Sequence, residues 1–239
     1  MLNKIQSIDY SIFFRERLAS YEKVKIAKEK IMKKCLPDII LFPIYGQNGI
    51  MWQDIVGKHR DTSARFLFPI LLEKDLQKEM LKVLGHFRWE ICRSEQGMQW
   101  NNLHYPSLTS EYTDYLQFYR KNSDLSPEAK VKIKTQLTQN GNRHRDVFTK
   151  DYADWILREA KGAMRVNRVV RNILYTYIPF SKKYREKLSE QSLYEEAGKR
   201  FRLEYNKRKK EIEISCNRFE RAGIPVPAEL MLTKQFYDI

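Results

Sequence analysis

Glycine and proline are scarce in this sequence, which contains 9 Gly and 8 Pro among 239 residues. Folds built from many short strands need frequent tight turns, and these two residues dominate such turns. Charged residues make up 31% of the chain, which is typical of proteins with many solvated helices. We therefore expect a mainly α protein that forms a single multi-helix domain.

Cysteine is rare as well, and Cys35, Cys92 and Cys216 lie far apart in the chain. An odd and widely spaced set argues against a disulfide framework and is typical of a reducing compartment. No two cysteines have the spacing of zinc ligands, and the four histidines are scattered. We therefore predict no metal site and no cofactor.

Long apolar runs are missing. The runs IILF and FLFPILL are much shorter than the roughly 20 apolar residues that a membrane-spanning helix needs. The first residues also lack the basic and then apolar pattern of a signal peptide. These observations predict a cytoplasmic protein without a transmembrane segment.

Acidic residues are outnumbered, because 44 Lys and Arg against 30 Asp and Glu give a formal net charge of +14. The excess lies in residues 1–36 and 126–190, whereas residues 37–73 hold 3 basic and 4 acidic residues. A basic surface attracts polyanions such as nucleic acid or an acidic protein. The same charges can instead be solvated helix faces, and composition alone leaves both readings open.

Most of the chain carries helix signals. Apolar residues recur at steps of 3 and 4 over residues 72–94, and Ser126 followed by Pro127 is a typical helix start. Gly223 stands where a glycine often follows a helix end. We predict helices over residues 9–35, 72–94, 107–122, 126–140, 151–177 and 192–222, and a short helix that begins at Ser181.

The segment 37–72 differs from the rest, because two apolar runs with internal prolines flank the turn dipeptide Asn48-Gly49. We predict a short β-hairpin or irregular insert here, with residues 44–45 pairing with 50–52, and no strands elsewhere. The domain prediction is a helical domain over residues 1–190 that contains this insert. Residues 191–239 would form a long C-terminal helix and an irregular tail packed on the same domain.

A basic ridge is the first candidate binding surface. On one helix over 151–177, five cations fall on a single arc of the surface, opposite an apolar face. They are Arg158, Lys161, Arg165, Arg168 and Arg171. Such a ridge suits phosphate groups or an acidic protein, although the same cations can pair with acids of this chain. Glu159 falls on the apolar side, so we expect it to form a buried ion pair, with Arg88 as a candidate partner and Arg60 and Arg65 as others.

The long C-terminal helix carries a narrow apolar seam at alternating steps of 4 and 3. Its apolar members are Phe201, Tyr205, Ile212 and Phe219, and its polar members are Arg208 and Ser215. We expect this seam to bind a protein partner, and self-association is left open.

The loop at 57–65 is a candidate anion site, because its side chains and a close-lying glycine could surround a phosphate or carboxylate. Its candidate ligands are Lys58, Arg60, Thr62, Ser63 and Arg65. The tripeptide His-Arg-Asp occurs at 59–61 and again at 144–146, but neither copy has the Asn that a kinase catalytic loop requires five residues later. Gly57-Lys58 likewise lacks the remaining residues of a Walker A loop.

No motif in the sequence gives a positive reason to expect an enzyme. The leading prediction is a non-enzymatic intracellular binding, regulatory or scaffold protein that engages a macromolecular partner through basic helical surfaces. One alternative is a nucleic-acid-binding protein that uses the ridge at 158–171. Another is a sensor or enzyme for a small anionic ligand, which would bind at the 57–65 loop.

Overall fold

The computed structural model describes residues 1–21, 26–53 and 63–238. Helices dominate these residues, so the mainly α prediction is confirmed. The α-helices are α1 Leu2–Ile8, α2 Leu76–Gln96, α3 Leu108–Phe118, α4 Pro127–Gln139, α5 His144–Leu157, α6 Arg168–Tyr177, α7 Lys182–Ser189, α8 Glu195–Arg221 and α9 Ala228–Phe236. Short 3₁₀ turns are η3 Gly97–Gln99, η4 Glu159–Lys161 and η5 Ser192–Tyr194. The strands are β1 Phe14–Tyr21, β2 Ile26–Lys34, β3 Asp38–Gly46, β4 Ile50–Trp52 and β5 Arg65–Leu72.

Several helix starts follow directly from capping residues. The Asp75 carboxylate accepts a hydrogen bond from the Lys78 backbone N–H at the start of α2. Ser107 and Ser126 cap α3 and α4 in the same way, and Pro127 occupies the first turn of α4. These side chains satisfy backbone donors that a helix start leaves without intrahelical partners.

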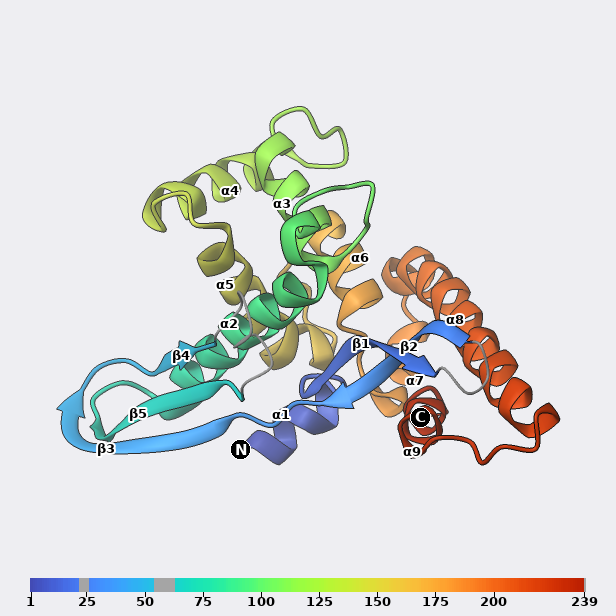
Figure 1. Ribbon diagram of the computed structural model, residues 1–239. Coiled ribbons are helices and arrows are strands. Elements are labelled where there is room, and N and C mark those ends of the chain that lie inside the picture. The colour runs from blue at the N-terminus through green and yellow to red at the C-terminus, as the bar shows by residue number, and fades with distance from the viewer. Residues whose placement is uncertain (22–25, 54–62, 239) are drawn as a thin grey trace.

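The prediction of a helix over residues 9–35 is wrong. α1 already ends at Ile8, and the described residues that follow form the antiparallel ribbon β1–β2, in which Phe14 pairs with Lys34. The ribbon crosses the middle of the molecule, and α9 lies below it in this view (Figure 1). Ile31 on β2 is buried against α8 and α9, so the ribbon is held by residues from the other end of the chain.

The predicted hairpin between residues 44–45 and 50–52 is also wrong. β5 lies between the two strands, pairing in parallel with β3 and antiparallel with β4. The turn at Asn48-Gly49 still connects β3 to β4. Gly49 is required there because a Cβ atom at this position would lie 2.4 Å from the ring of Phe68. Its N–H donates to the Glu79 carboxylate of α2 at 3.1 Å.

The main core fills the space between α2, α3, α5 and α6 and extends to α1, β5 and the start of α8. Trp89, Tyr112 and Phe148 pack their rings together at its centre. A second, smaller apolar cluster lies under the ribbon and consists of Ile31, Ile212, Cys216, Phe219 and Leu230. α9, which the sequence analysis assigns to an irregular tail, completes this second cluster.

No helix among the described residues is both long enough and apolar enough to cross a membrane.

The helix α8 ends as predicted. Gly223 adopts φ +66° just after it, and the Ile224 N–H donates back to the carbonyl oxygen of Phe219 at 3.0 Å.

Candidate functional site

The five cations of the predicted ridge do not share one helix. The chain leaves α5 at Arg158, forms η4 and turns at Gly162, which has φ +86°. It enters α6 after Asn167, whose side chain caps that helix by accepting from the Val170 N–H. The predicted continuous helix over 151–177 is therefore two helices with a break of ten residues between them, and the ridge does not form.

The ridge residues have separate roles in the structure. Arg158 forms an ion pair with Asp154 at 3.2 Å, and Arg168 forms one with Glu196 at 2.7 Å. Arg171 is only 4% exposed and turns inward. Lys161 and Arg165 remain exposed.

Glu159 is fully buried at the break between α5 and α6. Its carboxylate accepts from Arg171 Nε at 3.0 Å and from the Tyr194 hydroxyl at 2.6 Å. The backbone N–H groups of Arg165 and Val166 also donate to it. Burial alone would raise the pKa of Glu159, but these donors hold it below its ordinary value. The carboxylate thus fixes the break and the start of α8 around it.

The predicted pairing of Glu159 with Arg88 is therefore wrong. Arg88 is buried elsewhere, 3.7 Å from the carboxylate of Asp9. It donates to the carbonyl oxygen of Ser11 at 2.9 Å and to that of Tyr177 at 3.1 Å. This guanidinium joins the segment before β1 to the end of α6, which is a structural role.

The seam on α8 faces the protein's own interior. Phe201 packs edge-on against Tyr175 of the main core, and Ile212 and Phe219 belong to the second cluster. Tyr205 is half-buried, and its hydroxyl donates to the carbonyl oxygen of Tyr237. The prediction that this seam binds another protein is contradicted, because the intramolecular packing occupies it.

The candidate anion loop lies largely outside the described residues, which exclude Lys58, Arg60 and Thr62. Ser63 and Arg65 are described, and both are exposed. Arg65 begins β5, where it pairs in register with Asp38 of β3 and Trp52 of β4.

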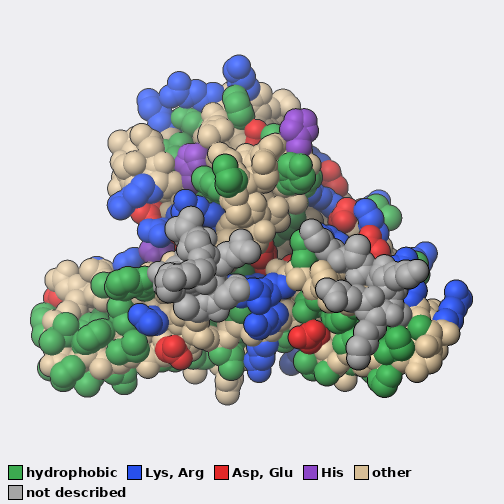
Figure 2. Space-filling view, in the orientation of Figure 1, with side chains coloured by type: hydrophobic (Ala, Val, Ile, Leu, Met, Phe, Trp, Pro, Cys, Tyr) green, Lys and Arg blue, Asp and Glu red, His purple; other side chains and the backbone are tan. Residues whose placement is uncertain are grey.

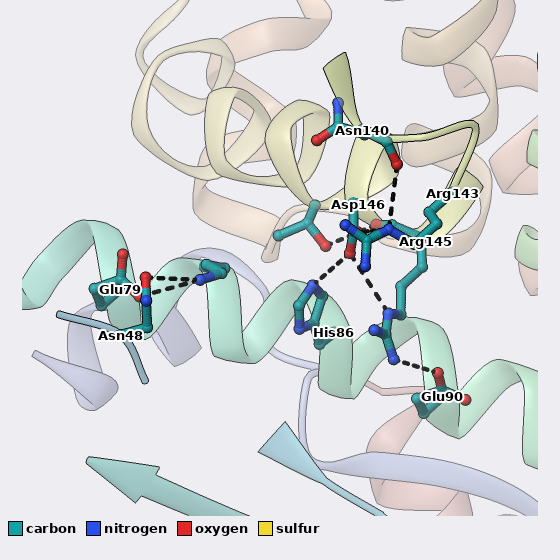
Figure 3. A network of polar contacts seen from close by, with 10 residues as sticks. Asn48, Glu79, His86, Glu90, Asn140, Arg143, Arg145 and Asp146 are labelled. Atoms are coloured by element: carbon teal, nitrogen blue, oxygen red, sulfur yellow. Dashed lines mark hydrogen bonds and ion pairs between the residues drawn. The ribbon is translucent and has the colours of Figure 1, made fainter. Parts of the chain in front are cut away.

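The second His-Arg-Asp tripeptide does form a polar network, between α2 and α5 (Figure 3). Asp146 accepts from Arg143 Nε at 2.9 Å and lies 3.1 Å from His86 Nε2, while Arg145 donates to Glu90 at 3.0 Å. Burial and the nearby Arg145 guanidinium lower the pKa of His86 to about 4. The imidazole is therefore neutral at neutral pH, and the network ties the start of α5 to α2.

Two adjoining hollows flank the ribbon β1–β2, with volumes of about 320 and 560 Å³. Both include Glu16, Leu18 and Lys30 in their walls. Charges of both signs are paired there, since Lys30 lies 2.6 Å from the Glu16 carboxylate and Arg208 lies 3.6 Å from it. The sequence analysis missed these hollows because it predicts a helix where the ribbon lies. Within the described residues, no group of three or more potential metal ligands converges.

The sheet β3-β5-β4 carries an exposed apolar surface. α2 packs against one face, where Phe66 and Phe68 are buried. Residues along a strand point alternately to the two faces of a sheet, and residues paired across strands lie on the same face. The residues of β5 that alternate with Phe66 and Phe68, together with their partners on β3 and β4, therefore form the opposite face, called the outer face below. The outer face consists of Asp38, Ile40, Phe42, Tyr45, Ile50, Trp52, Arg65, Leu67, Pro69 and Leu71.

Apolar side chains of the outer face are exposed to an unusual degree. Phe42 is 42% exposed, Ile50 58% and Leu71 64%. The space-filling view shows apolar side chains gathered over this sheet, at the left of the molecule (Figure 2). Parallel strand pairs such as β3–β5 are normally covered on both faces, whereas these described side chains of the outer face stay exposed. In the sequence, the apolar run around Pro43 indicates a strand rich in apolar residues, but not that one of its faces is exposed.

The comparisons with known proteins identify one family. Residues 97–237, more than half of the chain, match the model of a domain of unknown function, DUF8509. No curated protein and no solved structure matches the chain. The matched segment begins at η3 and includes α3–α9, whereas the ribbon, the sheet and α2 precede it. By this match the chain belongs to the DUF8509 family.

Proposed function

We propose that this chain is a non-enzymatic interaction module that binds another protein chain through the outer face of its β3-β5-β4 sheet. The observation that carries the proposal is the exposure of large apolar side chains on that face. The largest apolar patch of a typical monomer measures roughly 300–600 Å², and a patch at the upper end of this range is often a functional site. If a fully exposed large side chain contributes roughly 200 Å², the exposed apolar area of the outer face is on the order of 600 Å².

Charge favours a protein partner over an anionic one. Residues 37–73 carry 3 basic and 4 acidic residues in a chain whose net charge is +14. Nucleic acid and anionic membranes are bound through surfaces with an excess of cations, and this segment has no such excess. The unpaired state of Cys35, Cys92 and Cys216 supports a reducing, cytoplasmic location as part of the same proposal.

A photo-crosslinking amino acid at position 50 would test the proposal in cells that produce the chain. The same residue at position 203 is the matched control, since Leu203 of α8 is 73% exposed and lies outside the sheet. We expect a discrete protein adduct from position 50 and none from position 203. If position 50 gives no protein adduct, the outer face is not a binding surface and the proposal fails.

Nucleic-acid binding, the alternative function, would use a smaller basic surface than the ridge that the sequence analysis predicts. Lys132 of α4 donates to the backbone oxygen of Arg165 at 3.4 Å, so exposed cations of two segments meet there. If they bind nucleic acid, the double substitution K132E/R165E should weaken binding at least about tenfold, and binding should fall steeply with salt. Binding that both salt and these substitutions leave unchanged would remove this alternative.

A further inference from the structure

We infer that the protein bound at the outer face is a second copy of this chain, packed sheet against sheet. This inference rests on the proposed function, because it names the occupant of the same surface. In such a two-fold arrangement, the same residues of both copies meet, with the two sheets roughly 10 Å apart.

Electrostatics is the first argument for a second copy. Two chains of net charge +14 repel each other at most orientations, and the repulsion is smallest where both surfaces are nearly uncharged. The outer face holds one carboxylate and one guanidinium, Asp38 and Arg65, which are register neighbours at the same end of the sheet. An occupant must therefore present an apolar and nearly uncharged surface, and the outer face itself has those properties.

Area is the second argument. Two outer faces together would bury on the order of 1,200 Å², which reaches the lower limit of specific protein interfaces. Such an interface predicts a dimer that dissociates at micromolar concentrations rather than an obligate one.

The free edge of β3 directs the contact to the face of the sheet. Pro43 has no N–H to donate, and the register with β5 shifts between Phe42 and Tyr45. A proline and an irregularity on an edge strand both impede the addition of another strand. Pairing of two β3 edges into one continuous sheet is therefore disfavoured, whereas packing of the two faces needs no backbone donors.

Sedimentation velocity of the purified chain tests the inference, over about two decades of concentration around the micromolar range. We expect a reversible dimer whose Kd rises at least about tenfold in F42E and in I50E. Two controls carry the same new carboxylate: L203E on α8, and L41E, whose position pairs with buried Phe68 and so faces away from the outer face. Both should dimerise as the unaltered chain does, and circular dichroism would verify that every variant is folded.

Salt separates an apolar contact from a charged one, since raising the salt concentration should leave this dimer intact or strengthen it. A chain that stays monomeric throughout the range overturns the inference, and so does a dimer that F42E and I50E leave unchanged. Binding to anionic vesicles that F42E abolishes, without any dimer, would assign the face to a membrane instead. If the chain is monomeric but position 50 still gives an adduct with a different protein, the proposed function stands and only the second copy is refuted.

Discussion

Removal of the Arg171 guanidinium is the sharpest test of how this fold is held together. In R171M the buried Glu159 carboxylate loses the cation that lies 3.0 Å away. Breaking a buried ion pair by removing one partner costs about 3–5 kcal/mol, because the remaining charge is left without compensation. Since native domains are stable by only about 5–15 kcal/mol, this single change should remove a large part of the stability.

Urea unfolding followed by circular dichroism measures the effect, and R158M provides the matched control. Arg158 forms its ion pair with Asp154 at the surface, so the same substitution there should change the free energy of unfolding by less than about 1 kcal/mol. Y194F removes one hydrogen bond to the same carboxylate and should cost about 1–3 kcal/mol.

The pH dependence has a definite sign. The pKa of Glu159 is lower in the folded protein than in the unfolded chain, so its stabilising contribution is present above the unfolded pKa. That contribution is lost as pH falls through the folded pKa.

The conclusion that the buried ion pair stabilises the fold is refuted if R171M and R158M destabilise the protein equally, or if R171M lowers the free energy of unfolding by less than about 1 kcal/mol.

Three further predictions concern other parts of the fold. An NMR titration should find that the pKa of His86 is about 4. The free energy of unfolding should decrease as the pH falls from about 6.5 to 4, since the unfolded chain binds this proton first. An ordinary histidine pKa would contradict the buried network. G49A should destabilise by about 1–3 kcal/mol because its Cβ would clash with a ring of β5. G198A should stabilise slightly, because its Cβ would lie inside a helix and meet only the Arg202 side chain at an ordinary contact distance. Equal effects of the two substitutions in thermal unfolding would be inconsistent with this. F219A should lower the free energy of unfolding in urea by about 3–5 kcal/mol, because Phe219 is buried. L203A should lower it by less than about 0.5 kcal/mol, because Leu203 is exposed. A small loss for F219A would mean that the second cluster does not stabilise the fold as a core.

The sequence predicts those parts of the fold that depend on local signals. Ser126 and Pro127 start α4 where expected, and Gly223 follows the end of α8. The apolar spacing over residues 72–94 corresponds to α2, and Met80, Leu84 and Phe87 of that pattern are buried. Caps and periodicity act within a few residues of each other, so they can be recognised in one sequence.

The ribbon β1–β2 could not be predicted in this way. Its Lys, Glu and Ala residues have good helix propensity, but strand pairing depends on partners that are distant in sequence. Ile31 is buried by α8 and α9, and the Met32 N–H donates to the Thr233 hydroxyl at 2.9 Å. Tertiary contacts with residues up to 201 positions away therefore override the local preference.

The candidate ridge fails for a similar reason. A helical projection places Arg171 and Glu159 on different arcs, and it cannot show that the chain breaks between them. The break is stabilised by Tyr194, which precedes α8 and reaches the same carboxylate. The outer face of the sheet was equally hidden, because the sequence shows an apolar run in β3 but not which of its sides is left uncovered.

The contact between β2 and α9 has a consequence for synthesis of the chain on the ribosome. The residues joined by the hydrogen bond from Met32 to Thr233 are separated by 201 positions. At about 5–20 residues per second, the ribbon emerges roughly 10–40 s before the helix that covers it. During that interval Ile31 lacks its native cover, so this corner of the molecule is where nascent chains should depend most on chaperones.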